Sequence, residues 1–497
     1  MSNQTEYKNR KVLILGLAVS GYSAAKVLKE LGAEVTVNDY KDIDSSDEAK
    51  ELRSLGITVV SGGHPLSLLD QPIDLLVKNP GIPYSNNLLK EAEKRDIPII
   101  TDVEVAYTIS PSSLVAITGT NGKTTTTKMI ESLLVAEPGE GHIYSVGNIG
   151  TPSTTVALHS NPEDTLVMEV SSFQLMGTKT FRPNIAVITN LHSAHLDYHG
   201  SREEYVEAKM AITKNQKAED YLIYNHDQLE LTNLVLSASE AQLIPFSRKS
   251  LLDKGVYLDG GVIYFNNEKI MDSSSIVLPG KHNLENALAA IAVAKLHNVT
   301  NQTIEKVFSH FHGVPHRMQF VDDIRERRFY NDSKATNSLA TINALEGFQQ
   351  KVILLAGGMD REDDLENLIP SFRNHVKALF TFGETKNKLL EVGKKAGISE
   401  QAAFETLSEA VYKAFEISEK YDVILLSPSC ASWDAYANFE ARGQDYIDTI
   451  RNIKSMMKKE SKHPSECIIY ENISNWWRYR RPYLSGSCAD QTDESDE

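Results

Sequence analysis

The sequence of 497 residues is poor in cysteine and has no long apolar run. Its three cysteines, Cys430, Cys467 and Cys488, are widely spaced and odd in number, which argues against a disulfide framework and favours a reducing compartment. The longest mostly apolar stretch, Ala287 to Leu296, is too short to cross a bilayer. The first residues, MSNQTEYKNRK, have no apolar core of the kind that a secretory signal needs. We therefore expect a cytoplasmic protein without stable membrane insertion.

Basic residues are also in deficit. The chain has 51 lysines and arginines against 67 aspartates and glutamates, a formal net charge of −16. This balance argues against nucleic acid as a partner. It leaves room for anionic small ligands, because salt screens distant surface charges over about 8 Å and a local basic pocket then prevails. The hydrophobic fraction of 41% and the charged fraction of 24% exclude a collagen, a disordered chain and a membrane bundle.

The length predicts about three domains of roughly 150 residues each. Alternating strand-like and helix-like segments predict an α/β fold throughout. The first segment has a strand at 11–15, a turn GLAVSG at 16–21 and helical spacing at 22–31, which is the start of a βαβ unit. We expect a Rossmann-like N-terminal domain (1–110), a central P-loop ATPase-type α/β domain (111–312), a Rossmann-like C-terminal α/β domain (313–458) and a disordered tail (459–497).

The strongest local signal is the string GTNGKTT at 119–125, between a predicted strand and a predicted helix. Small residues let backbone N–H groups approach phosphate oxygens, and a helix N-terminus adds a partial positive charge. Lys123 can then reach the terminal phosphates, and the Thr124 hydroxyl can hold Mg²⁺. A glycine-rich turn with a solvated lysine is the alternative. The predicted ATP contacts in this loop are Gly119, Thr120, Asn121, Gly122, Lys123, Thr124 and Thr125.

Polar residues follow two further predicted strands of the central domain. Glu169 comes after the run 165–168, where a carboxylate can bind Mg²⁺, although it can equally be a surface residue of a loop. The segment 190–199 contains three histidines, but it has no cysteine and no closed four-ligand pattern for zinc. We favour His195 as a contact to a second magnesium ion or a phosphate. From the pattern alone, Lys209 is an exposed helix lysine.

Eight motifs in the same order resemble those of the Mur ligase family, over about residues 8 to 455. The family joins an amino acid to a UDP-linked muramoyl substrate through an acyl phosphate that ATP supplies. The resemblance is greatest to the member that adds D-glutamate to UDP-N-acetylmuramoyl-L-alanine. It implies ATP and Mg²⁺ as cofactors and a monomer. The motifs are GTNGKTT (119–125), SVGNIG (145–150), EVSSFQL (169–175), HLDYH (195–199), LPGKHNLEN (278–286), HRM (316–318), NDSKATN (331–337) and SPSCASWD (427–434).

The resemblance implies roles for residues that the pattern alone leaves undecided. Lys209 matches a lysine that is carbamylated in the family, and the carbamate would be an anionic metal ligand. Lys123, His195 and Lys209 would be catalytic, and Thr124, Glu169, His195 and Lys209 would hold metal. Further nucleotide contacts would be Asn283, Asn286, Arg317 and Asp332, and the UDP-substrate contacts would be Ala18, Val19, Ser20, Asp39, Gly81 and Asn148.

The amino-acid substrate would bind in the third domain. The matching residues there are Thr336, Arg361, Ser432 and Phe439. Arg361 departs from the family, which carries lysine in a GGDGK string where this chain has GGMDR at 357–361. An arginine can still pair with a carboxylate, in a bidentate manner.

Other functions compete with this interpretation. A sister Mur ligase that adds another amino acid, or a folylpolyglutamate synthetase, would share the ATP-binding domain. An NAD-dependent oxidoreductase would use Gly16-x-Ala18-x-x-Gly21, but Ala18 replaces the central glycine of the dinucleotide fingerprint, and the 119–125 loop has no role there. A nucleotide-binding regulator without turnover is a further class.

Overall fold

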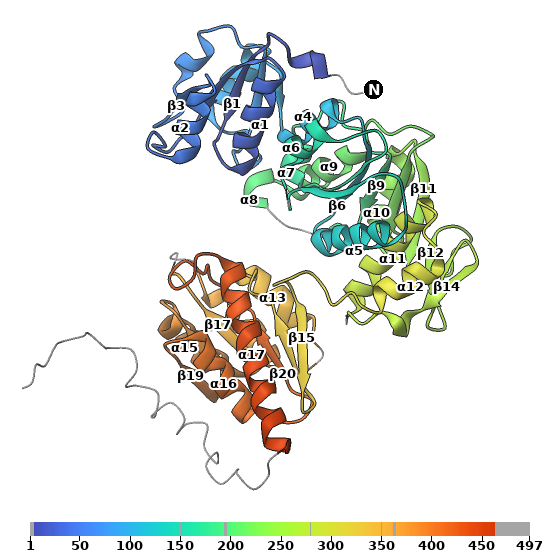
Figure 1. The fold of residues 1–497 in the computed structure, drawn as a ribbon, viewed down its shortest axis with the longest axis vertical. Coiled ribbons are helices and arrows are strands. Elements are labelled where there is room, and N and C mark those ends of the chain that lie inside the picture. The colour runs from blue at the N-terminus through green and yellow to red at the C-terminus, as the bar shows by residue number, and fades with distance from the viewer. Residues whose placement is uncertain are drawn as a thin grey trace, which may run out of the picture. The chain divides into compact units, whose positions relative to one another are not determined.

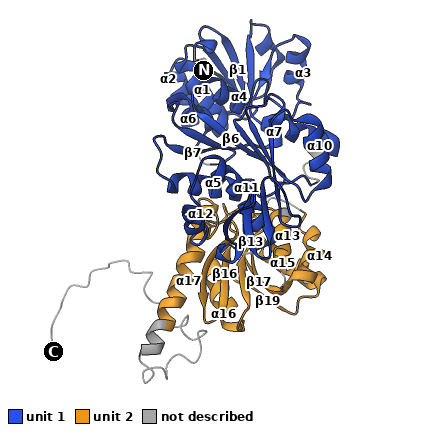
Figure 2. Ribbon diagram, turned by 90° about the vertical axis from the view of Figure 1, so that its right-hand side faces the viewer, with its two compact units in different colours: residues 1–311 blue, residues 312–497 orange. Residues whose placement is uncertain are grey.

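The computed structural model describes residues 4–149, 151–192, 196–278, 280–348, 350–360 and 364–462. The chain divides into two compact units, residues 1–311 and residues 312–497 (Figure 2). The first unit contains two sheets and the second contains one. Among the described residues, no helix combines the length and the apolar character that spanning a membrane requires. Of the tail predicted at 459–497, residues 459–462 belong to the last helix and those from 463 onward lie outside the described residues.

The first sheet has five parallel strands in the order β3-β2-β1-β4-β5. Its strands β1 and β3 are labelled, with helices α1 and α2, in the blue part of Figure 1. The order reverses between β1 and β4, so their carboxyl ends border the crevice where ligands bind in such sheets. A Cβ on Gly21 would lie 2.0 Å from the Gly16 carbonyl oxygen, so glycine is needed where α1 packs on the turn. The elements are β1 (Lys11–Leu15), α1 (Val19–Glu30), β2 (Glu34–Asn38), α2 (Asp47–Ser54), β3 (Thr58–Val60), β4 (Leu75–Lys78), α3 (Asn87–Lys94), β5 (Ile99–Ile100) and α4 (Asp102–Ile109).

The second sheet has nine strands in the order β14-β13-β12-β11-β10-β9-β6-β8-β7, parallel from β12 to β7. The elements are β6 (Ser113–Thr118), α5 (Lys123–Ala136), β7 (Ile143–Gly147), α6 (Ser153–His159), β8 (Thr165–Glu169), α7 (Ser172–Leu175), β9 (Ile185–Ile188), α8 (Leu196–His199), α9 (Arg202–Met210), β10 (Tyr221–Asn225), α10 (Leu229–Ala238), β11 (Gln242–Ser247), β12 (Val256–Asp259), β13 (Val262–Phe265), β14 (Glu268–Asp272), α11 (Lys281–Leu296) and α12 (Asn301–Phe308).

Strand β6 is buried on both faces. Leu114 and Ala116 pack into one apolar core, whereas Val115 and Ile117 pack into another, together with residues of α5 and α11. This alternation explains why the strand is a continuous apolar run in the sequence. It also fixes the end of β6, and therefore the start of the 119–122 loop, between two packed layers.

The third sheet has the order β15-β16-β20-β17-β18-β19, and all its pairs are parallel except β15–β16. Helices α14 and α15 pack against each other, as do α16 and α17. The elements are β15 (Gln319–Ile324), β16 (Arg327–Asn331), α13 (Ser338–Glu346), β17 (Val352–Gly357), α14 (Ile369–His375), β18 (Val376–Phe382), α15 (Lys386–Ala396), β19 (Glu400–Ala403), α16 (Leu407–Ile417), β20 (Val423–Leu426) and α17 (Phe439–Lys462).

The predicted α/β class is confirmed in all three sheets. The strand expected at 11–15 has the observed bounds, and the strand, loop and helix around 119–125 are present. The sequence analysis did not identify β10 to β14, which are five of the nine strands of the second sheet. The predicted domain ranges 1–110, 111–312 and 313–458 stay a prediction.

Candidate functional site

The loop between β6 and α5 is held in a conformation that needs glycine at two positions. Gly119 has φ +144° and Gly122 has φ +81°. A Cβ on Gly119 would lie 2.0 Å from Thr189 Oγ1, and one on Gly122 would lie 2.2 Å from Asn286 Oδ1. Gly122, the N-cap residue of α5, makes no side-chain cap. The partial positive charge of a helix N-terminus at the end of such a loop favours an anion.

Residues that follow β9, the neighbour of β6 in the sheet, hold the 119–122 loop through hydrogen bonds. Asn190 accepts from the backbone N–H of Thr120 through its carbonyl (3.0 Å) and from that of Asn121 through Oδ1 (2.9 Å). The Thr189 hydroxyl donates to the Asn121 carbonyl at 2.6 Å. The polar residues predicted at this strand end thus act on the loop itself and preorganise it.

Two lysine amines converge on one carbonyl of the loop. The Nζ atoms of Lys123 and Lys209 lie 2.9 Å and 2.8 Å from the Gly119 carbonyl oxygen. Lys209 is only 2% exposed, so the exposed position that its sequence pattern suggested is wrong. Burial drives the pKa of Lys209 well below its ordinary value; the Lys123 charge lowers it further, and Glu169 opposes both effects. An amine in this state is unprotonated more readily than a surface lysine.

Glu169 ends β8 with one carboxylate oxygen unpartnered. The side chain is 2% exposed, and Ile117 of β6 is its register partner. Asn148 Nδ2 donates to Oε1 at 2.8 Å, while Oε2 is buried and accepts no hydrogen bond from the described residues. Leaving a buried charged oxygen unpaired is costly, and a bound cation would remove that cost.

The donor set around Glu169 fits Mg²⁺. The ion prefers oxygen ligands and keeps several positions for water and phosphate oxygens. Thr124 is buried in the first turn of α5, directly after the 119–122 loop, and offers a hydroxyl oxygen. Among the described residues, no three histidine, cysteine, aspartate or glutamate side chains form a metal-binding group, so protein ligands alone do not complete a cage. His195, the other predicted metal contact, lies outside the described residues.

Two asparagines of α11 lie beside the phosphate loop. Asn283 and Asn286 are both buried, and Asn286 Nδ2 donates to Asn283 Oδ1 at 3.4 Å. Asn286 is the residue that a side chain at Gly122 would strike. Helix α11 packs along α5, which brings residues more than 150 positions apart to one place. The structure therefore brings the predicted nucleotide contacts Asn283 and Asn286 beside the predicted ATP contacts of the 119–125 loop.

The predicted UDP contacts of the first sheet also converge. Ala18 is the N-cap of α1 and makes no side-chain cap, and Val19 is exposed. Asp39 Oδ2 accepts from the backbone N–H of Leu17 at 2.6 Å. Asn79 links two further predicted contacts, Ser20 and Gly81. Its Nδ2 donates to Ser20 Oγ (3.2 Å), and its Oδ1 accepts from the Gly81 N–H (3.1 Å). Asn148, the last of the predicted UDP contacts, follows β7 of the second sheet, and its side chain donates to Glu169.

Sequence reasoning missed a buried lysine in this region. Lys78 ends β4 and is 1% exposed; its Nζ donates to the carbonyls of Asn79 (3.3 Å) and Pro80 (3.2 Å) and to the Tyr198 hydroxyl (3.4 Å). Burial lowers the pKa of Lys78 to about 8, against the opposing charge of Asp102. The signal in the sequence is a lysine that continues the apolar strand LLVK. Lys78 and Tyr198 thus join the 79–82 loop to α8.

In the second unit, Asp332 is a buried carboxyl group directly after β16. It accepts from the Met318 N–H (3.1 Å) and the Ser427 hydroxyl (2.9 Å). Burial raises the pKa of Asp332 to about 7, although both hydrogen bonds and the nearby Arg317 charge lower it. The predicted nucleotide contacts Arg317 and Asp332 are therefore close enough to interact electrostatically.

Asp332→Asn is expected to flatten the pH dependence of stability. The folded pKa lies above the ordinary 3.8, so the folded protein binds more protons between these values and its free energy of unfolding falls as pH rises through that window. Asparagine can still accept from the Met318 N–H through Oδ1, its Nδ2 can donate to Ser427 Oγ, and the substitution removes this fall, which amounts to at most about 4 kcal/mol. Thermal unfolding of both proteins between about pH 5 and about pH 8 measures the effect. Parallel pH profiles would contradict it.

The predicted amino-acid contacts surround the carboxyl ends of β16 and β20. Ser432 is buried, and its carbonyl accepts from the Tyr436 N–H at 2.8 Å. The carbonyl of Phe439 accepts from the Ser333 hydroxyl at 2.8 Å, and Lys334 Nζ lies 5.7 Å from the Phe439 ring. Thr336 is half-buried in the same loop as Ser333. Arg361 lies outside the described residues.

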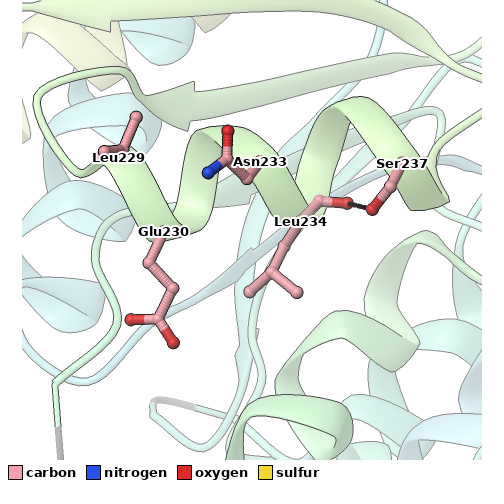
Figure 3. A pocket seen from close by; sticks show the side chains of 5 residues that line it. All are labelled: Leu229, Glu230, Asn233, Leu234 and Ser237. Atoms are coloured by element: carbon pink, nitrogen blue, oxygen red, sulfur yellow. Dashed lines mark hydrogen bonds between the residues drawn. The ribbon is translucent and has the colours of Figure 1, made fainter.

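A surface hollow of about 470 Å³ is found elsewhere, on α10 (Figure 3). Leu229 and four further residues of this helix line it, and the Ser237 hydroxyl donates to the Leu234 carbonyl at 3.0 Å. None of its lining residues belongs to the predicted site. The 119–125 loop, on which Lys123, Lys209 and Asn190 converge, is the better candidate.

Comparison with known proteins agrees with this geometry. Three family models match the chain: Mur ligase MurD-like, N-terminal domain, at 10–101; Mur ligase middle domain at 117–294; and Mur ligase, glutamate ligase domain, at 316–430. A UDP-N-acetylmuramoylalanine--D-glutamate ligase of Enterococcus faecalis is 56% identical over 91% of this chain and 99% of its own length. The protein of that name from Lactiplantibacillus plantarum is 51% identical over 91% and 98%.

Solved structures share the fold at low identity. The UDP-N-acetylmuramate-alanine ligase MurC of Thermotoga maritima has a TM-score of 0.52 at 20% identity, and the match covers 89% of this chain and 99% of that one. The MurF ligase of Thermotoga maritima, solved in complex with ADP, has a TM-score of 0.51 at 16% identity and covers 92% and 98%. Both are three-domain α/β neighbours in fold alone.

Proposed function

The chain belongs to the Mur ligase family, and on that premise we propose that it uses ATP to add D-glutamate to UDP-N-acetylmuramoyl-L-alanine in peptidoglycan precursor synthesis. The observation that carries the choice of amino acid is the identity of 56% to a D-glutamate ligase over nearly the whole of that relative. The geometry around 119–123 supports the use of a triphosphate.

The reaction needs activation of a carboxylate, which is a poor electrophile. The γ-phosphoryl group of ATP passes to the alanyl carboxylate, which gives ADP and an acyl phosphate. The amine of D-glutamate then attacks the carbonyl carbon, and phosphate leaves as the amide forms. Two anions approach in the first step, and at 4 Å their repulsion is about 4 kcal/mol at an effective dielectric of 20.

Residues of the central sheet supply the positive charge and the ligands for this step. Lys123 would leave the Gly119 carbonyl for the γ-phosphate, and the α5 N-terminus would hold phosphate oxygens. Mg²⁺, when bound, screens the phosphate charge, and Thr124 and Glu169 would hold it. His195 would serve a second metal ion or a phosphate. We assign Asn283, Asn286, Arg317 and Asp332 to the nucleotide.

Lys209 is proposed to carry a carbamate. Its amine would attack carbon dioxide, form the N–C bond and release one proton, which turns a cation into an anionic metal ligand. The depressed pKa of Lys209 supports this step, because only the unprotonated amine reacts. The proposed UDP-substrate contacts are Ala18, Val19, Ser20, Asp39, Gly81 and Asn148, and the proposed D-glutamate contacts are Thr336, Arg361, Ser432 and Phe439.

The enzyme is proposed to act as a monomer in the cytoplasm. A coupled assay of phosphate release tests the whole assignment across a panel of amino acids. Release should require ATP, UDP-N-acetylmuramoyl-L-alanine and D-glutamate together. Release with L-lysine or L-alanine in place of D-glutamate would move the chain to a sister ligase, and release without the UDP substrate would overturn the proposal.

Tyr198→Phe is expected to raise KM for the UDP substrate about fivefold, through loss of one to two hydrogen bonds, and to leave KM for ATP unchanged. The Tyr198 hydroxyl lies 3.0 Å from the carbonyl oxygens of Pro80 and Ile82, next to the proposed contact Gly81. Initial rates at varied concentrations of each substrate measure this. Equal rises in both KM values would mean that Tyr198 does not act through the 79–82 loop.

A further inference from the structure

Arg442 of α17 is completely buried, with an exposed fraction of 0%. Its Nε and Nη2 donate to the Ser333 hydroxyl (3.0 Å) and the Ser333 carbonyl (2.9 Å). Its Nη1 lies within hydrogen-bonding distance of three carbonyls, those of Gly357 (3.3 Å), Cys430 (3.0 Å) and Ala431 (3.2 Å). One guanidinium therefore binds backbone groups from three separate segments of the second unit.

These three segments follow neighbouring strands. The sheet order β16-β20-β17 places the carboxyl ends of the three strands side by side. Ser333 follows β16, Cys430 and Ala431 follow β20, and Gly357 ends β17. Ligands of parallel α/β sheets bind at this edge. The proposed amino-acid contacts Thr336 and Ser432 lie in two of the same segments.

The backbone packs closely around the Arg442 guanidinium. Gly358 has φ +148°, and a Cβ there would lie 2.1 Å from the Ala431 carbonyl oxygen and 2.9 Å from Arg442 Nη1. The Met359 N–H donates to the Ala431 carbonyl at 2.9 Å. Ser333 also donates to the carbonyl of Phe439, the first residue of α17. The loops, the guanidinium and the helix start form one connected network.

Backbone carbonyl dipoles, rather than an ion pair with a carboxylate, stabilise the charge of Arg442. No ion pair within 4.0 Å involves Arg442 among the side chains that the structure describes. Burial lowers its pKa to about 10, while Asp434 is the carboxylate that opposes this shift most. The group stays protonated at neutral pH. The buried guanidinium therefore places a positive charge beneath the edge where an amino acid with two carboxylates would bind, and Asp434 is the carboxylate that interacts with it most.

We propose that Arg442 is a positioning residue for the incoming amino acid: it fixes the loops after β16, β20 and β17 and gives their edge the positive potential that an acidic side chain requires. This inference rests on the proposed function. Arg442 itself does not touch the substrate, because it is completely buried and each of its three nitrogens donates to the protein. It acts through Ser333 and Ala431 on their neighbours in the loops.

The test compares three full-length variants by their KM values for each substrate. Arg442→Met removes charge and hydrogen bonds and is expected to raise KM for D-glutamate about a hundredfold, as a displaced binding loop would. Arg442→Lys keeps the charge but not the fork of donors, and a rise of about tenfold is expected. KM for the UDP substrate should stay within about twofold of the parent value in both.

Arg327→Lys is the matched control. Arg327 begins β16, at the opposite end of the same strand, and its Nε and Nη2 also donate to a carbonyl, that of Ser418 (3.1 and 2.9 Å). This variant loses comparable contacts in the same unit, yet its KM for D-glutamate should not change. A rise equal to that in the Arg442 variants would reduce Arg442 to a general stabilising role and overturn the proposal.

The outcomes distinguish a failure of the proposed function from a failure of the role proposed for Arg442. If the parent protein shows no turnover with D-glutamate, the proposed function fails. If the parent turns over D-glutamate and Arg442→Met has the parent KM, the proposed function stands and the role of Arg442 is refuted. If Arg442→Met does not fold, the decision passes to Arg442→Lys, for which an unchanged KM for D-glutamate is the refuting result.

Discussion

Lys123→Ala is expected to reduce turnover by at least about a thousandfold while the protein stays folded. The amine of Lys123 lies over the 119–122 loop, on the carbonyls of Gly119 and Thr120. It is the cation that this loop can bring to the γ-phosphate when the substrate carboxylate approaches. The repulsion of about 4 kcal/mol that it offsets corresponds to about a thousandfold in rate. Single-turnover phosphate release and circular dichroism measure activity and folding.

Lys128→Ala provides the control for this variant. Lys128 lies on the same helix, α5, and pairs with Glu131 at 2.7 Å on its surface, away from the loop. The Lys128→Ala variant also loses one positive charge from α5. Because that charge lies away from the loop, the activity of this variant should equal that of the parent. Near-normal turnover in folded Lys123→Ala would remove the phosphate loop from the mechanism, and with it the proposed ATP site.

Glu169→Gln is expected to lower turnover at least about a hundredfold and to raise the Mg²⁺ concentration needed for half-maximal activity, because a cation's charge stabilisation is worth several kcal/mol. The glutamine can still accept from Asn148, so the local hydrogen bond is kept. What changes is Oε2, the buried oxygen that has no hydrogen-bond partner among the described groups. Rates measured across a Mg²⁺ titration separate weaker metal binding from damage to the fold.

Glu163→Gln makes the same chemical change two residues before β8, at the opposite end of that strand and in an exposed position. It should leave both the rate and the Mg²⁺ requirement unchanged. If Glu169→Gln had the parent Mg²⁺ titration curve, Glu169 would not be a metal ligand, and its burial beside Asn148 would be structural.

Sequence reasoning located the parts of the site that depend on neighbouring residues. The strand, turn and helix around Lys123 follow from a short apolar run, two glycines and helical spacing, all within about 25 positions. Glu169 and Asn190 could be placed at one edge because parallel strands end at the same side of a sheet. Register then sets Glu169 opposite Ile117, which no sequence pattern specifies.

The features that were missed depend on contacts between distant segments. The approach of Asn286 to Gly122 results from the packing of α11 on α5 and has no local signal. Arg442 has a weak signal: it occupies a position of the buried stripe of α17 that continues with Tyr446, Ile450 and Ile453. A charged residue within such a stripe indicates a buried polar network. Lys78 carries the same signal in a strand.

The shared carbonyl of Gly119 has a consequence for how the resting protein meets its ligands. The carbonyl oxygen can accept two hydrogen bonds, but two ammonium groups beside it repel each other, so the arrangement favours any event that neutralises one of them. Loss of a proton from Lys209, which burial promotes most and the Lys123 charge promotes further, is one such event, and it leaves an amine able to react with an electrophile as small as carbon dioxide. Arrival of a polyanion at Lys123 is the other, and it relieves the same repulsion.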